Sequence, residues 1–245
     1  VNNVQIGAPG QGFTIEGFDL NNAVQEGAAI RFSGASSGTS IIDNEIVADG
    51  EHGLLVLYNQ AVQDLTVDGN VFSGKTFTGS SPAGDGFGQQ FSLLNVPRQL
   101  VVISGGSNVT NVQDITFTNN QVTGTAGGTN SASTHPNGEQ GNQLVTIDAV
   151  GATITGNTFS GTTTRYAASL RVRGSNTTVS GNTFSSAGLT PTTAHFTRDS
   201  NALSSATPST LAGVVGANSF DKGVYVDGGP AIGVAIQPAV DIIPA

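Results

Sequence analysis

The chain has 245 residues and a formal net charge of -9, because 17 acidic residues outnumber 8 basic ones. This balance excludes a nucleic-acid-binding protein, since neutralising phosphates requires a basic face. Cysteine is absent, which excludes disulfides and thiolate sites, and no apolar run has the length that a membrane span needs. Charged residues are only 10% of the chain, so uncharged polar residues must cover the surface, as in an exported protein.

One motif recurs along the chain, in its clearest form as Gly151-Ala152-Thr153-Ile154-Thr155-Gly156-Asn157-Thr158-Phe159-Ser160-Gly161. With Asn157 as the reference, the equivalent positions hold Phe18, Asn44, Asn70, Asn120, Asn182 and Asn218. Three residues before each reference stands an apolar residue: Ile15, Ile41, Val67, Phe117, Ile154, Val179 and Val215. Two residues after it stands another: Leu20, Ile46, Phe72, Val122, Phe159, Phe184 and Phe220. Repeats of this size indicate stacked structural units.

The residue before each reference position predicts a bend. It is Gly17, Asp43, Gly69, Asn119, Gly156, Gly181 or Ala217, and all but the last are types that tolerate left-handed backbone angles. A second strand pattern precedes the corners, within 29–32, 54–57, 100–103, 144–147 and 169–172, and appears again later within 223–226. Three short strands in roughly 25 residues make one coil of a parallel β-helix, whose stacked asparagines can hydrogen-bond from coil to coil.

In chain order, residues 1–22 form an imperfect first coil, in which Phe18 departs from the asparagine column, and regular coils run to residue 74. The stretch 75–98 is a long loop or, as the second choice, a degenerate extra coil. Further loops are expected near 125–142 and 187–212, and a C-terminal cap near 228–245. The sequence therefore predicts an all-β fold, with residues 1–245 forming a single-domain right-handed parallel β-helix, or solenoid, of about seven to eight coils.

These repeats resemble the right-handed parallel β-helix repeat family, whose members include pectate-lyase-like enzymes, phage tailspikes and surface adhesins. The resemblance covers nearly the whole chain through its corner motifs. It implies the fold directly. For function it implies either a structural solenoid or an enzyme of acidic polysaccharides, because one fold hosts many functions.

Aligning the longer strands puts two columns of side chains on an outer face. One column holds Arg31, Val56, Val102, Thr146, Arg171 and Tyr225, and the other holds Ser33, Tyr58, Ser104, Asp148, Arg173 and Asp227. One interpretation is a glycan-binding face made by Tyr58, Asp148, Arg171 and Arg173. The other is an exposed salt bridge between Asp148 and Arg173, worth about 0 to 1 kcal/mol.

If the protein is an enzyme, the resemblance implies a polysaccharide lyase or epimerase with Arg171, Arg173, His195 and Tyr225 as catalytic candidates. Such enzymes often hold calcium, but no clear metal site is present: the tight polar clusters are Asp43 with Glu45, and Asp19 with Asn21 and Asn22. No cofactor is expected otherwise. A hydrolase is the weakest enzyme hypothesis, because Asp148 and Asp227 do not form a carboxylate pair.

The first functional hypothesis is a structural or adhesive module of an extracellular surface or filament protein. The alternatives are the lyase or epimerase and a non-catalytic glycan-binding module. Methionine is absent even at position 1, so we expect a processed form or part of a longer parent chain. The expected partners are further copies joined end to end, that parent chain, or a polysaccharide, and the expected location is extracellular or at the cell surface.

Overall fold

The structure is a computed structural model, which describes residues 5–6, 14–16, 28–48, 52–56, 60–74, 99–106, 108–126, 144–163, 169–174, 176–185, 192–197, 217–220 and 223–227. Every pair of strands in this part of the chain is parallel, and its one helical element is the short 3₁₀ turn η1 (Val109–Asn111). The fold is therefore the all-β parallel solenoid that the repeat predicts. None of these residues belongs to a helix with the length and hydropathy needed to cross a membrane.

Three long sheets run the length of the stack. Sheet D contains β3 (Ala28–Phe32), β7 (His52–Val56), β11 (Val101–Ser104), β16 (Val145–Asp148), β20 (Leu170–Arg173), β23 (Thr192–Thr197) and β25 (Gly223–Asp227). Sheet B contains β1 (Gln5–Ile6), β5 (Ser40–Ile42), β9 (Thr66–Asp68), β13 (Thr116–Thr118), β17 (Thr153–Thr155) and β21 (Thr178–Ser180). Sheet C contains β2 (Thr14–Glu16), β6 (Glu45–Ala48), β10 (Val71–Gly74), β14 (Gln121–Val122), β18 (Thr158–Phe159), β22 (Thr183–Phe184) and β24 (Ser219–Phe220).

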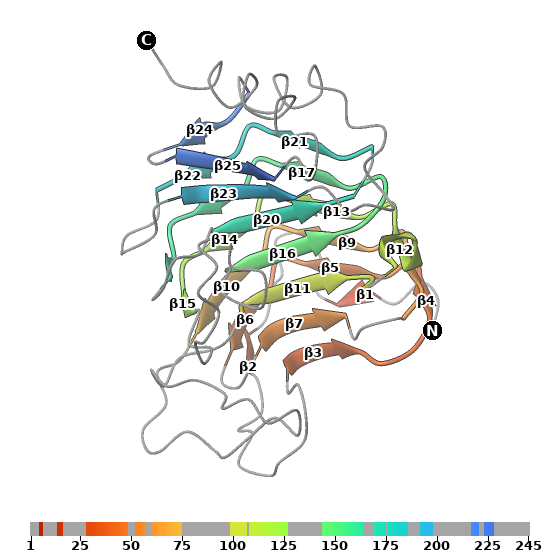
Figure 1. Cartoon of the computed structure of the whole chain (residues 1–245). Coiled ribbons are helices and arrows are strands. Elements are labelled where there is room, and N and C mark those ends of the chain that lie inside the picture. The colour runs from red at the N-terminus through yellow and green to blue at the C-terminus, as the bar shows by residue number, and fades with distance from the viewer. Residues whose placement is uncertain are drawn as a thin grey trace, which may run out of the picture.

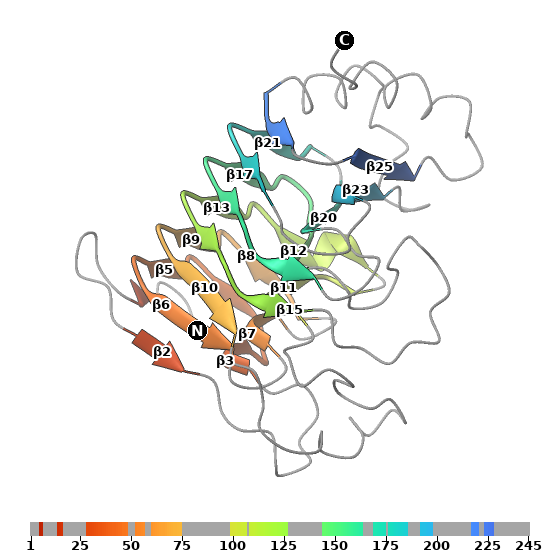
Figure 2. The same cartoon turned by 90° about the vertical axis from the view of Figure 1, so that its left-hand side faces the viewer.

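Two shorter sheets complete the coils. They contain β4 (Ser36–Ser37), β8 (Val62–Gln63) and β12 (Val112–Gln113) in one, and β15 (Thr125–Ala126) and β19 (Thr162–Thr163) in the other. The strands of sheet D climb in chain order from β3 to β25 (Figure 1). Those of sheet B form a matching series of steps from β5 to β21 (Figure 2). Each strand thus pairs with its counterparts in the neighbouring coils.

Two left-handed corners bound each sheet B strand from β5 to β21, where the sequence analysis predicts only one. The predicted corner has positive φ, between 54° and 69°, at Asp43, Gly69, Asn119, Gly156 and Gly181. A second corner precedes the strand, with positive φ at Gly38, Asp64, Asp114, Gly151 and Asn176. Both sets consist of Gly, Asp and Asn, the types that adopt this conformation at least cost.

The core lies between the three long sheets and is filled by the two predicted apolar columns. Ile41, Val67, Phe117, Ile154 and Val179 are buried on sheet B, and Ile46, Phe72, Val122, Phe159 and Phe184 are buried on sheet C. The Phe184 ring stacks on those of Phe159 and Phe220, with centroid distances of 4.7 Å and 4.9 Å. Sheet D closes the core with the alternate residues of its strands, such as Ile103 and Ile147.

The predicted asparagine column forms a continuous hydrogen-bonded ladder beside this core. In each coil the backbone N–H and Nδ2 of one asparagine donate to Oδ1 of the next, at 2.8 to 3.1 Å. The ladder links Asn44, Asn70, Asn120, Asn157, Asn182 and Asn218 in that order. From Asn70 onward, each Nδ2 also donates to a backbone carbonyl of the preceding coil, as Asn120 does to Val67 at 2.9 Å. Buried amides are stable here because the neighbouring coils supply their partners.

The ladder decides between the two interpretations of the stretch 75–98. Asn70 donates directly to Asn120 although 50 residues separate them, and β10 pairs directly with β14. No coil can therefore lie between them, which excludes the degenerate extra coil. Residues 75–98 themselves, like Phe18 and the expected cap near 228–245, lie outside the described residues.

Two of the predictions, one alignment and one loop, are wrong. The sequence analysis places Ile15 before the corner, but Ile15 pairs with Ile46, in the strand after the corner, and Ile6 pairs with Ile41 instead. The first coil therefore has its own spacing. The sequence analysis predicts a loop near 187–212, yet this stretch contains β23, which adds a sheet D strand between β20 and β25. Of the stretch 125–142, only β15 is described.

Candidate functional site

Parallel register in sheet D brings several of the predicted candidates to neighbouring strand positions. Thr146 pairs with Arg171, Arg171 with His195, and His195 with Tyr225. One line of register therefore runs through three of the four catalytic candidates. Residue 195 joins this line only because of β23, which the sequence analysis did not predict.

A second line lies two residues further along the same strands. Ser104 pairs with Asp148, Asp148 with Arg173, and Arg173 with Thr197. In β11, β16 and β20 the residues between the two lines, Ile103, Ile147 and Val172, are buried in the core, because side chains alternate across a strand. The face is thus built from the strand ends of several coils rather than from one segment of sequence.

Asp148 lies at the centre of a charged cluster that also contains Ser104, Arg171 and Arg173. Its Oδ2 accepts a hydrogen bond from Ser104 Oγ at 3.0 Å and lies 3.3 Å from Arg173 Nη2 and 3.6 Å from Arg171 Nη2. The side chain of Asp148 is 3% exposed, whereas those of Arg171 and Arg173 are 15% and 18% exposed. Two guanidinium groups thus share one buried carboxylate, and the cluster carries a formal charge of +1.

Arg173 also ties the cluster to the connection after β11. Its Nη2 donates to the carbonyl of Gly106, and the Gly106 N–H donates to Ser104 Oγ at 3.1 Å. Gly106 has a positive φ of 68°, so glycine suits this tight turn. The turn, Ser104, Asp148 and Arg173 therefore form one network across three neighbouring coils.

Some hydrogen-bonding capacity of the cluster is unused. Asp148 Oδ1 and Arg171 Nε are both buried without a hydrogen-bond partner. A carboxylate oxygen can only accept a hydrogen bond and the Nε–H can only donate one. A group that both donates and accepts, such as a hydroxyl group or a water molecule, has the chemistry to satisfy either atom.

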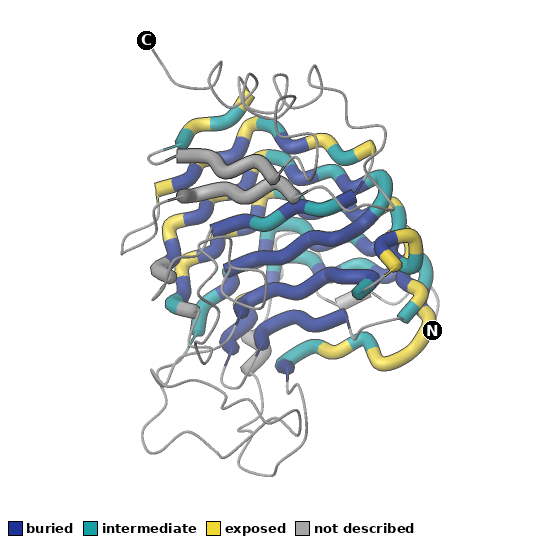
Figure 3. The backbone as a smooth tube through the Cα atoms, in the orientation of Figure 1, coloured by how far each residue is buried: buried dark blue, intermediate teal, exposed yellow. Residues whose placement is uncertain are grey.

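The predicted salt bridge between Asp148 and Arg173 is present, but the prediction that it is exposed is wrong. Asp148 does contact Arg173, but it is buried, as are Ser104 and Thr146 beside it. Figure 3 shows the central strands of sheet D, β7, β11 and β16, buried along their length. The contribution of this cluster to the stability of the fold is therefore that of a buried charged network and not that of a surface ion pair.

One predicted column is also out of register. Val102 pairs with Leu55, so Leu55 and not Val56 occupies the outer column between Arg31 and Val102. Val56 is buried in the core. Leu55 and Val102 form a small apolar cluster with Ala28, separate from the core. Tyr58, the fourth glycan-binding candidate, lies outside the described residues.

The sequence analysis missed a polar connection next to the cluster. Gln99 Nε2 donates to Thr146 Oγ1 at 2.7 Å, and the Gln99 carbonyl lies 3.2 Å from His52 Nδ1. All three side chains are buried. Gln99 precedes a strand and belongs to no repeated motif, so only the coil-to-coil contacts reveal its role.

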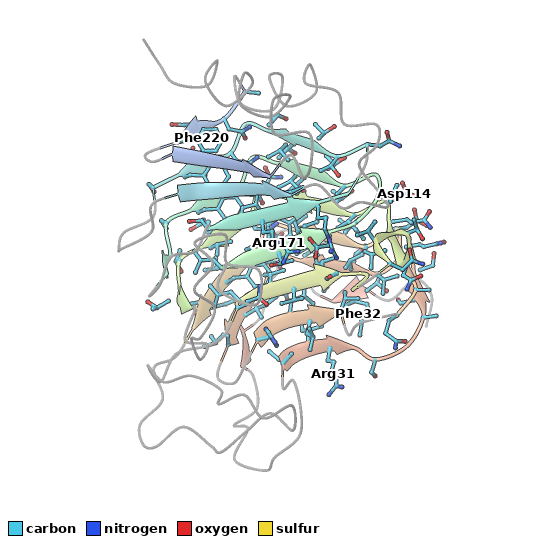
Figure 4. All side chains as sticks on the ribbon, viewed as in Figure 1. Arg31, Phe32, Asp114, Arg171 and Phe220 are labelled. Carbon is cyan, nitrogen blue, oxygen red and sulfur yellow. The ribbon has the colours of Figure 1, made fainter. Side chains whose placement is uncertain are left out.

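The described residues contain no group of three or more His, Cys, Asp or Glu side chains placed to hold a metal ion. Asp43 and Glu45 form the polar cluster that the sequence analysis considers for calcium in this part of the chain. Asp43 is a corner residue with a φ of 54°. Asp114 has the equivalent role at the other corner and lies far from Arg171 in the view of Figure 4. Asp19, Asn21 and Asn22 lie outside the described residues.

Comparison of the chain with models of known protein families, with curated proteins and with solved structures finds no match.

Proposed function

We propose that this chain is a rigid structural or adhesive module of an extracellular surface or filament protein, and that it belongs to the right-handed parallel β-helix repeat family. The observation that carries the proposal is the unbroken asparagine ladder from Asn44 to Asn218. A stack whose coils are locked in register resists bending and shear. Repeat proteins extend along one axis in this way and present their surface as a long rigid scaffold.

The charged cluster supports a structural role as well. Asp148 and Arg173 use much of their hydrogen-bonding capacity to join three coils through Ser104 and Gly106. This network reinforces sheet D, as the ladder reinforces the corner between sheets B and C.

The test combines a determination of where the protein lies in producing cells with an assay for enzymatic turnover of polysaccharides. Surface labelling of producing cells with an antibody against the chain, before and after protease shaving, should show an exposed antigen, and micrographs should show rods or end-to-end filaments. A panel of uronate-containing polysaccharides, with and without calcium, should give no unsaturated-product absorbance. An intracellular antigen, or turnover that Arg171→Ala abolishes, would contradict the structural proposal.

A glycan-related function is the second candidate, either turnover by a lyase or epimerase or binding without turnover. It is favoured by the register line Thr146, Arg171, His195 and Tyr225 and by the unpartnered Asp148 Oδ1 and Arg171 Nε. Retention on immobilised acidic glycans tests the binding form. Arg171→Ala should reduce retention, whereas Arg31→Ala, at an exposed position near the other end of sheet D, should not.

A further inference from the structure

The outer face of sheet B carries a regular two-dimensional array of hydroxyl groups. The inward residues of β5, β9, β13, β17 and β21 are buried, so the residue on either side of each points outward. These outward residues are Ser40 and Ile42, Thr66 and Asp68, Thr116 and Thr118, Thr153 and Thr155, and Thr178 and Ser180, here called the hydroxyl face. All but Ile42 and Asp68 carry a hydroxyl group, and all are half-buried or exposed.

The array is ordered in both directions. Ser40, Thr66, Thr116, Thr153 and Thr178 pair in sequence along one column, and Ile42, Asp68, Thr118, Thr155 and Ser180 along the other. Neighbours in a column are about 4.8 Å apart, and the two columns are separated by two residues of strand, about 6.7 Å. The asparagine ladder follows directly after sheet B in each coil and fixes this register before any partner binds.

Most of these hydroxyl groups are not used within the protein. Thr118 Oγ1 donates to Asp68 Oδ1 at 2.6 Å. In the described part of the chain, the hydroxyls of Thr66, Thr116, Thr153, Thr155 and Thr178 make no hydrogen bond. Buried hydroxyls elsewhere do, as Ser36 and Thr39 do with each other at 2.8 Å. The hydrogen-bond donors and acceptors of these hydroxyl groups are therefore available to solvent or to a binding partner.

Strand propensity alone does not account for the array. Threonine is favoured in strands, but so are valine, isoleucine and aromatic residues. In the neighbouring sheet C, the outward positions at the start of β6, β10, β14, β18, β22 and β24 hold Glu45, Val71, Gln121, Thr158, Thr183 and Ser219. Sheet C thus holds hydroxyl residues at three of these six positions, whereas sheet B holds them at eight of its ten outward positions from β5 to β21.

A periodic face of this kind matches a partner that is itself periodic. Recognition of a polysaccharide uses aromatic platforms and charged side chains, and the face has neither, except Asp68. Each Ser or Thr hydroxyl both donates and accepts, as a water molecule does. Hexagonal ice exposes planes on which oxygen atoms repeat at spacings comparable with those of the face. We propose that the hydroxyl face binds the surface of ice crystals.

The proposal goes beyond the structural function and is tested on the intact chain by ice recrystallisation inhibition and by the shape of single ice crystals grown in its presence. The wild type should slow recrystallisation and produce faceted crystals. The double variant Thr116→Lys/Thr153→Lys should lose both effects, because its long charged side chains hold the lattice away. Thr153→Val, which replaces the hydroxyl with a methyl group at nearly the same volume, should weaken them.

Thr158→Lys is the matched control, since Thr158 is exposed on sheet C in the same coil as Thr153, and it should retain both effects. Circular dichroism and the urea midpoint establish that each variant is folded. A wild type without effect on ice, equal loss in Thr158→Lys, or retention on crystalline cellulose or chitin without any effect on ice would overturn the proposal. None of these results bears on the rigid-module proposal, which rests on the ladder.

Discussion

Asn120 Nδ2 donates to Asn157 Oδ1 at 3.1 Å, although 37 residues separate the two in the chain. The same contact, repeated in every coil from Asn44 to Asn218, keeps coils of different length in one register. Coil length therefore varies in the connections from sheet C to sheet D and from sheet D to sheet B, while the corner between sheets B and C keeps one length from β5 to β22.

Asn120→Ala should lower the free energy of unfolding by about 3 kcal/mol, because it removes the acceptor of the buried Asn70 backbone N–H together with the side-chain bonds to Asn70 Nδ2 and to the Val67 carbonyl. Urea unfolding at constant m-value measures the change. Asn218→Ala is the control: Asn218 is partly exposed, so water can replace its bonds and the loss should be smaller. Equal losses would mean that burial of the ladder does not determine its contribution.

The ladder was predictable from the sequence because it repeats: the asparagines, the apolar residues around them and the residue type before the corner recur together. The second corner was predictable in principle, since Gly38, Asp64 and Asp114 lie five positions before Asp43, Gly69 and Asn119. The network around Asp148 was only partly predictable. Its burial and its contact with Ser104 depend on which coils become neighbours.

Errors of register explain the remaining differences. Assigning Val56 in place of Leu55 to the outer column is a shift by one residue, which exchanges the two faces of a strand. β23 was missed because no asparagine corner follows it at the usual distance. Its pairing with β20 and β25 shows its place. Sequence periodicity thus predicts the repeating units, and strand pairing alone fixes their alignment where the period breaks.

Asp148→Ala should destabilise the chain by about 3 to 5 kcal/mol, because it leaves two largely buried guanidinium groups without their carboxylate. Asp148→Asn should cost less, since the amide still accepts the Ser104 hydrogen bond. A double-mutant cycle with Arg171→Met separates the pair energy from the cost of the stranded charge. A change below about 1 kcal/mol for Asp148→Ala would instead match an exposed ion pair.

Gly156→Ala should cost about 1 to 2 kcal/mol, because Gly156 has a φ of +69°. The added Cβ would also lie 2.7 Å from Asn119 Oδ1, and Asn119 is held by Asp68 at 2.8 Å. Gly34→Ala is the matched control, since nothing lies within 4 Å of the position of its Cβ. Thermal unfolding should show a lower midpoint for the first variant and little change for the second. The reverse order would rule out the left-handed corner as the cause.

Phe184→Leu should destabilise the core by about 1 to 2 kcal/mol, because the ring stacks on both Phe159 and Phe220. Phe117→Leu loses a single, looser contact with Phe72, whose ring centroid is 6.1 Å away, and should cost less. Urea midpoints of the two variants compare these costs directly. A larger effect at Phe117 would show that cavity volume, rather than stacking, dominates.

The distance between spin labels at Ser40→Cys and Thr178→Cys tests the in-register stack most directly, since the chain has no other cysteine to label. These positions lie in the same column of sheet B, and three intermediate strands, β9, β13 and β17, separate them. Four strand spacings predict a narrow distribution centred near about 19 Å. A distribution centred beyond about 30 Å, which is more than six spacings, or one without a defined peak would contradict the stacked solenoid.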